Sequence, residues 1–190
     1  MGRGKDRDVD GNETLQQLRE QQYTTLALAD QIKDDRWREP LLSGGNSAHA
    51  VLSHLLAWDE WAIGAFEVSL VRDELPPTFQ AALDDVDAFN GRAMARYRTV
   101  SRDDLLTSLQ TASSRLATSA TAAGGADWAK RRLNGLTTTF TARDGSGTRT
   151  VTLSVGGVLR TLTTHEAEHT REIGDAYGVS APSPTEAPQS

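Results

Sequence analysis

The chain has 190 residues, of which 37% are hydrophobic, 24% charged and 6% aromatic, a composition typical of a soluble globular domain. Twenty Lys and Arg against 26 Asp and Glu give a net charge of −6 without a basic stripe, which argues against nucleic acid as a partner. No apolar run approaches the ~20 residues of a membrane span, and the absence of cysteine excludes disulfides, thiolate ligands and a cysteine nucleophile. We therefore expect a cytoplasmic protein that binds neither nucleic acid nor a membrane.

Both ends of the chain have compositions typical of disordered tails. Residues 1–11 are charged and contain glycine, and residues 179–190 carry three of the six prolines. Between these tails, residues 12–178 are expected to form a single domain.

Apolar residues three or four positions apart predict helices over most of this domain. In chain order, we expect helices over about residues 12–34, 47–72, 79–97, 101–123 and 154–177. Ser47 (or Asn46) and Ser101 are suited to cap the second and fourth of these helices, and Gly178 is suited to end the last.

The segment before the last helix has a different character. Residues 137–153 are rich in threonine, and the Asp-Gly-Ser-Gly stretch over residues 144–147 is typical of a turn, so a short β-hairpin is predicted. The fold class is therefore all-α: a four-helix bundle with a short β-hairpin insertion before the last helix.

Three of the four histidines are placed to face the interior of this bundle. His165 and His169 are four residues apart, so on a helix they lie one turn apart and can share a metal ion. His54 lies at the centre of the inner face of its own helix. A single inward histidine is more often a hydrogen-bonded core residue, but three would each need a partner, at about 1–3 kcal/mol for every unpaired polar group. The pattern therefore favours a metal site, whereas His49 is predicted to be solvated on the surface.

Residues 165–169 read HEAEH, which satisfies the H-E-x-x-H pattern of zinc peptidases with Glu166 as general base. The residues that follow contain no Gly-x-x-His to supply a third ligand. A peptidase is therefore not favoured.

Three segments resemble the DinB/YfiT-like superfamily of four-helix bundles, and the resemblance covers about residues 12–178. Two carry the histidines: SAHAVLSHLLAWDEW in the second helix, and VTLSVGGVLRTLTTHEAEHTREI in the hairpin and last helix. The third, DDVDAFNGRAMARYRTVSRDDLL, is similar to the middle helices of the mycothiol-dependent maleylpyruvate isomerase branch.

This resemblance implies a divalent metal ion (zinc, nickel or iron) held by His54, His165 and His169. Relatives include thiol S-transferases that use bacillithiol or mycothiol, the isomerase named above, and the metal-binding part of ergothioneine sulfoxide synthases. Because a thiol bound to a metal loses its proton near neutral pH, such an ion suits thiol chemistry, and in a chain without cysteine the thiol has to arrive as a cosubstrate. The same ion could instead activate water for hydrolysis.

Four further residues are candidates for the surroundings of the site. Trp58 and Trp61 could form the wall of a substrate pocket or simply belong to the core. Glu166 and Glu172 could orient an imidazole or pair with an arginine.

Two classes of function remain open from the sequence. The first is a metal-dependent thiol S-transferase, isomerase or hydrolase that acts on a small electrophile. The second is a non-catalytic stress-response or binding module, whose metal only ties two helices together. A fourth protein ligand such as Glu166 would favour the second class, because structural ions are usually sealed by four ligands. The sequence also leaves a homodimer open.

Overall fold

Four long helices make up most of the fold in the computed structural model, which describes residues 10–122, 124–141 and 147–180. The elements, in chain order, are α1 (Gly11–Asp30), α2 (Ala48–Val68), α3 (Pro77–Asp84), α4 (Val86–Tyr97), α5 (Arg102–Thr121), β1 (Arg132–Thr141), β2 (Thr148–Ser154) and α6 (Val155–Tyr177). Two single turns of 3-10 helix lie at Ser43–Gly45 and Trp128–Lys130.

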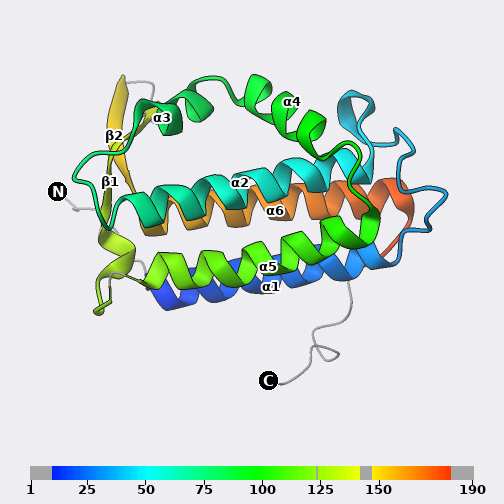
Figure 1. Cartoon of the computed structure of the whole chain (residues 1–190), viewed down its shortest axis with the longest axis horizontal. Helices are drawn as coiled ribbons and strands as arrows, with labels where there is room; N and C mark the ends of the chain where they lie inside the picture. The colour runs from blue at the N-terminus through cyan, green and yellow to red at the C-terminus, as the bar shows by residue number, and fades with distance from the viewer. Residues whose placement is uncertain (1–9, 123, 142–146, 181–190) are drawn as a thin grey trace.

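The bundle is built from α1, α2, α5 and α6. Helix α1 packs against α6, α2 packs against α5, and α2 also contacts α6 (Figure 1). The short helices α3 and α4 form an arm along the outer side of α2, and the β1–β2 hairpin stands at one end of the bundle. The predicted fold class, a four-helix bundle with a hairpin before the last helix, is confirmed.

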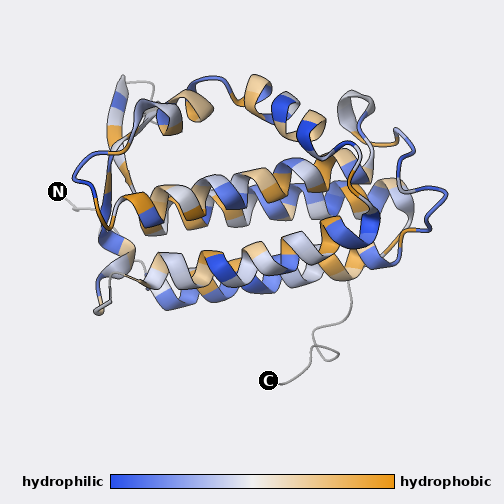
Figure 2. Ribbon diagram, in the orientation of Figure 1, coloured by the Kyte–Doolittle hydropathy of each residue, from blue (hydrophilic) through white to orange (hydrophobic). Residues whose placement is uncertain are grey.

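Helix α2 is the central element of the fold. Fifteen of its 21 residues are buried, because α4, α5 and α6 all pack against it. Figure 2 shows that apolar residues recur along its whole length, whereas α1 and α5 expose many hydrophilic ones.

Most predicted helix ends are confirmed by caps. The side chains of Ser47, Ser101 and Ser154 each accept a hydrogen bond from a backbone N–H in the first turn of α2, α5 and α6. Helix α6 ends at Gly178, which has a left-handed backbone with φ of 67°. Helix α1 differs from the prediction, since Asp10 caps it through the N–H groups of residues 12 and 13 and it ends at Asp30.

The predicted single helix over residues 79–97 is two helices. Asp85 breaks it with φ of −139° and ψ of 75°, and its side chain accepts a hydrogen bond from the N–H of Ala88 at 3.0 Å. The break arises because a short acidic side chain bonds to the backbone ahead of it and caps a new helix in place of continuing the old one. The two helices, α3 and α4, form the bent arm over α2.

The hairpin is antiparallel, with Thr137 opposite Thr152 and Thr141 opposite Thr148. It extends further toward the N-terminus than predicted, as β1 begins at Arg132 and carries an irregularity before Thr137. Most of the predicted turn at 144–147 lies outside the described residues.

The predicted tails also lie mainly outside the described residues, which begin at Asp10 and end at Ser180. Their inner ends are ordered parts of the fold: Gly11 is a buried residue of α1, and the carbonyl of Ser180 accepts a hydrogen bond from Gln31. Within the described ranges, none of the helices combines the length and the apolar character that crossing a membrane requires.

Candidate metal centre

His54, His165 and His169 converge between α2 and α6. The Nε2 atom of His169 lies 3.0 Å from Nε2 of His54 and 3.2 Å from Nε2 of His165. The rings of His54 and His165 stack with their centroids 5.3 Å apart, and the ring of His169 stands edge-on to both. The structure thus brings together the three residues that the sequence singled out as metal ligands.

The spacing of these nitrogens fits a shared ion. Two imidazole nitrogens that each lie about 2.0–2.1 Å from one metal ion, at tetrahedral or octahedral angles, are roughly 2.9–3.4 Å apart. Both short distances to His169 fall in this range, and one ligand atom from each of the three residues lies within 4.8 Å of the other two. Within the described part of the chain, this cluster of potential ligands has only these three members.

Burial keeps two of the imidazoles neutral. It lowers the pKa of His54 from 6.5 to about 3 and that of His165 to about 4, and in both cases the neighbouring His169 lowers the pKa further. A neutral imidazole has a free lone pair, so these residues can act as ligands without first losing a proton.

Glu172 fixes the orientation of His169. Its Oε2 lies 3.0 Å from Nδ1 of His169, and its Oε1 accepts a hydrogen bond from the backbone N–H of Ser43 at 2.7 Å. Partial burial raises the pKa of Glu172, but the hydrogen bonds from Ser43 and His169 outweigh this effect and hold the pKa below its ordinary value. A carboxylate on Nδ1 places the proton there and leaves Nε2 free to point toward the other two histidines.

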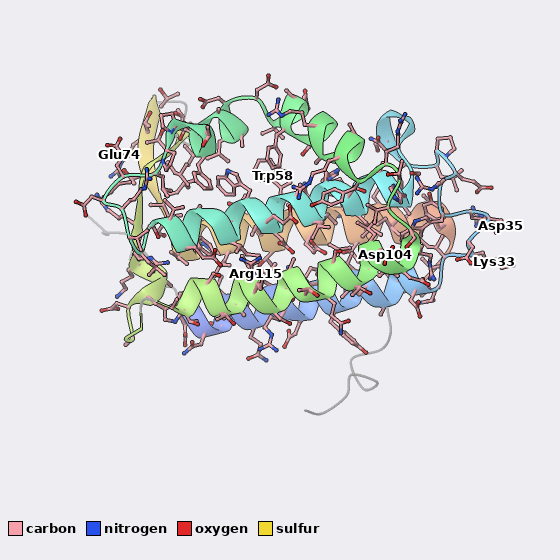
Figure 3. All side chains as sticks on the ribbon, in the orientation of Figure 1. Lys33, Asp35, Trp58, Glu74, Asp104 and Arg115 are labelled. Carbon is pink, nitrogen blue, oxygen red and sulfur yellow. The ribbon has the colours of Figure 1, made fainter. Side chains whose placement is uncertain are left out.

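Trp58 and Trp61 form the wall of a cavity next to His165. The cavity has a volume of about 460 Å³, and both indole rings and His165 line it. Figure 3 shows Trp58 pointing from α2 toward the α3–α4 arm, where its Nε1 donates a hydrogen bond to Asn90 at 2.9 Å. The ring of Trp58 is edge-on to that of His165, with 6.5 Å between the centroids.

A second, smaller cavity of about 260 Å³ is lined by His54, His169 and Glu172. Its other lining side chains are mainly polar and include Asp87 and Asn90 from α4. Neither residue could be recognised from the sequence as part of the site, because their position there depends on how the bent arm lies against α2.

Glu166 lies in a buried polar layer instead of among the histidines. Its side chain forms a hydrogen bond with Thr25 of α1, and burial raises its pKa to about 7. Asp59 belongs to the same layer, accepts a hydrogen bond from Gln22 at 2.8 Å, and has its pKa raised by burial and by the proximity of Glu166. The glutamate that a zinc peptidase would use as general base is therefore hydrogen-bonded to α1.

The prediction that His49 is a solvated surface residue is wrong. It is 3% exposed, with its Nε2 3.1 Å from the carbonyl oxygen of Val100 and its ring edge-on to Trp37. Burial lowers its pKa. The reason is that the loop before α2 and the segment before α5 cover this side of α2, and His49 shares the face of Leu52 and Leu56, which was the signal available in the sequence.

Comparisons with solved structures agree with the fold. An uncharacterised protein of Escherichia coli UTI89 superposes with a TM-score of 0.68 at 12% identity, over 90% of this chain and 96% of that one. YfiT from Bacillus subtilis, described as a probable metal-dependent hydrolase with an unusual four-helix bundle topology, superposes with a TM-score of 0.57 at 18% identity, over 95% of this chain and 94% of that one. No curated protein matches the sequence.

The family model of the DinB superfamily matches residues 17–173, a span that runs from α1 to α6 and includes all three clustered histidines. The chain belongs to the DinB superfamily.

Proposed function

We propose that the chain binds one divalent metal ion through His54, His165 and His169 and uses it to activate a small nucleophile against a small electrophilic substrate. The observation that carries this proposal is the convergence of the three Nε2 atoms at the spacing of a shared ion. Imidazole ligands suit zinc, nickel and iron alike, so the identity of the ion has to be measured.

The residues around the cluster have separate tasks in this proposal. A divalent ion held by three neutral imidazoles acts as a Lewis acid and lowers the pKa of a water or thiol that binds beside them. Glu172 holds the tautomer and the ring orientation of His169. The ring of Trp58 limits the movement of a substrate beside His165.

Two observations support an open, catalytic ion over a sealed, structural one. The cluster has three potential ligands within the described ranges, whereas structural sites usually have four. Two cavities reach the cluster, one at His165 and one at His54 and His169.

The nucleophile distinguishes two candidate reactions. Transfer of a low-molecular-weight thiol, with mycothiol as the first cosubstrate and bacillithiol as the second, is supported by the two separate cavities, because such a reaction has two substrates. Hydrolysis is supported by the description of YfiT as a probable metal-dependent hydrolase. We favour thiol transfer, since hydrolysis alone leaves the second cavity without a role.

Metal uptake tests the first half of the proposal. Elemental analysis after dialysis against zinc or nickel is expected to find about one ion per chain. His54→Ala and His169→Ala are expected to weaken binding by orders of magnitude. His49→Ala is the matched control, since His49 is a buried histidine of the same helix outside the cluster, and it is expected to retain the ion. Equal loss in all three variants, or no uptake by the wild type, contradicts the proposal.

Turnover tests the second half. The metal-loaded protein is incubated with 1-chloro-2,4-dinitrobenzene and either mycothiol, bacillithiol or no thiol, and with 4-nitrophenyl acetate as a hydrolysis substrate. We expect thiol-dependent consumption that chelation abolishes and zinc or nickel restores. Chelator-sensitive hydrolysis without any thiol effect would identify a hydrolase, and failure of both reactions would leave the non-catalytic module.

A further inference from the structure

The larger cavity has a composition that restricts the substrate. Its volume of about 460 Å³ lies in the range of small-molecule sites. Five elements contribute to its lining. Its apolar part comes from Trp58 and Trp61 of α2, Leu83 and Val86 of the arm, Leu153 of β2, and Val158 and Leu162 of α6. These side chains surround the approach to His165 with hydrocarbon and aromatic surface.

The aromatic wall is held in place by hydrogen bonds that point away from the cavity. Nε1 of Trp58 donates to Asn90, and Nε1 of Trp61 donates to the carbonyl oxygen of Phe79 at 3.2 Å. The two indole rings are edge-on to each other, with 5.4 Å between their centroids. The ring of Phe89 packs against that of Trp58, with 4.3 Å between the centroids. Because both indole donors are already used, the wall offers ring surface and no indole N–H to a ligand.

The charges of the lining residues disfavour anionic ligands in this cavity. Glu168 is the one charged side chain among its described lining residues, and Thr161 and Thr164 are the remaining polar ones besides His165. No lysine or arginine of the described residues lines it. A substrate with a carboxylate or phosphate inside the cavity would lack a counter-charge there.

The two cavities at the histidine cluster therefore differ in chemistry. The cavity at His165 is apolar, whereas the one at His54 and His169 carries Asp87, Asn90 and Glu172. A substrate with one apolar and one polar end can occupy only one orientation across such a site.

Building on the proposed function, we infer that the cavity at His165 binds the apolar end of the substrate. The substrate class is an uncharged molecule that carries an aromatic or alkyl group of one or two rings, with its reactive group directed at the histidines. Substrates whose buried end is anionic are disfavoured.

The first test needs no metal. Binding of 2-naphthol to the full-length, chelator-treated protein is measured by isothermal titration calorimetry. Thr164→Trp places an indole at the mouth of the cavity from an exposed position of α6, and Thr107→Trp makes the same change at an exposed position of α5 that does not line it. We expect saturable binding by the wild type and Thr107→Trp, and affinity at least about tenfold weaker in Thr164→Trp. Absent binding by the wild type, or equal affinities in all three proteins, overturns the inference.

Thr161→Trp, also at an exposed lining position of α6, repeats the test if Thr164→Trp does not fold. Circular dichroism and thermal melting decide whether each variant is folded.

A second test connects the cavity to the cluster. Benzohydroxamate and acetohydroxamate share one metal-binding group and differ in the phenyl ring, and their binding to the cobalt-loaded protein is followed in the visible spectrum. The phenyl ring is expected to strengthen binding by on the order of tenfold to a hundredfold in the wild type and Thr107→Trp, and much less in Thr164→Trp. If benzohydroxamate binds the wild type no more tightly than acetohydroxamate does, the placement of the cavity beside the ion is contradicted.

The two tests separate this inference from the proposed function. Binding of 2-naphthol without cobalt uptake would contradict the proposed metal site and leave the apolar cavity standing. Cobalt uptake without binding of 2-naphthol, and with equal affinities for the two hydroxamates, would contradict the apolar cavity as a binding site and leave the proposed metal site standing.

Discussion

Burial and hydrogen bonding set the protonation states of the side chains around the cluster. His54 and His165 are neutral because α2 and α6 remove them from water, and His169 has its orientation fixed by Glu172. The Nε2 atoms of His54 and His165 both lie close to Nε2 of His169. Substitutions of single residues should therefore distinguish the effect of Glu172 on the orientation of His169 from the effect of burial on His54 and His165.

Substitution of Glu172 tests orientation. Glu172→Gln keeps the size of the side chain but removes the charge that favours the proton on Nδ1 of His169. We expect zinc affinity to fall by about 10–100-fold, measured by competition with a chromophoric chelator. Asp175→Asn is the control, because Asp175 is an exposed carboxylate of the same helix that lines neither cavity. Equal affinities in Glu172→Gln and the wild type would show that the carboxylate does not support the ligand.

The pH dependence of stability tests burial of the histidines. Folding lowers the pKa of His54 and His165 from 6.5 to about 3 and about 4, so below pH 6.5 the unfolded chain binds more protons than the folded one. This contribution to stability is complete above pH 6.5 and is lost as the pH falls toward 4. In urea denaturation with a chelator present, the wild type should lose more stability between pH 7.5 and 5 than His54→Ala does.

The raised pKa of Glu166 changes stability with pH in the opposite direction. Because Glu166 is present in both the wild type and His54→Ala, its effect cancels when the two are compared. An equal loss in the wild type and His54→Ala would contradict the burial argument.

The sequence predicted the three-histidine cluster because a residue of known chemistry on an apolar helix face is an unusual combination. It did not reveal Asn90 and Asp87, which are ordinary polar residues of an amphipathic helix until the arm folds against α2. It misplaced His49, although His49 shares a helix face with Leu52 and Leu56, because the segments that cover this face lie outside the helix itself.

At the scale of elements, apolar spacing and caps predicted the long helices and the hairpin, since these depend on local sequence. The division of residues 79–97 at Asp85 was missed because apolar periodicity runs through the break and only the capping bond at Ala88 reveals it. The bent arm has a direct consequence for the site, because α4 supplies Asn90 to Trp58 and Asp87 to the smaller cavity.

The polar layer between α1, α2 and α6 predicts an unusual response to removal of a charge. Folding raises the pKa of Asp59 above 3.8, so above that pH the unfolded chain releases a proton that the folded chain retains, and stability falls as the pH rises. Asp59→Asn preserves an acceptor for Gln22 and removes this loss. We expect the variant to gain roughly 1 kcal/mol or more over the wild type at pH 8, with a smaller gain at pH 5, in urea denaturation.

Asp175→Asn is the matched control for this prediction, since Asp175 is exposed on α6. It is expected to change stability little at either pH. An equal effect of both substitutions, or a loss of stability in Asp59→Asn that grows with pH, would contradict the raised pKa of Asp59.

At the scale of the whole molecule, the folded domain should be independent of the chain outside residues 10–180. The compositions of 1–9 and 181–190, rich in charge, proline and small residues, offer little apolar surface to offset the entropy of ordering. A variant restricted to residues 10–180 should melt within about 3 °C of the full chain.

The shortened chain has to keep Asp10, because this residue caps α1. Asp10→Ala in the full chain should cost about 1 kcal/mol, or about 2–4 °C in melting temperature. A large drop on truncation to 10–180 would show that one of the removed segments packs against the domain.

The account as a whole depends on one ion shared by α2 and α6 between two chemically different cavities. Anomalous diffraction at the zinc edge from crystals of the zinc-loaded protein tests this most directly. We predict one peak per chain, about 2.0–2.1 Å from Nε2 of His54, His165 and His169, with no fourth protein ligand. A peak bound elsewhere, or an ion at this cluster sealed by a fourth side chain, would contradict the account.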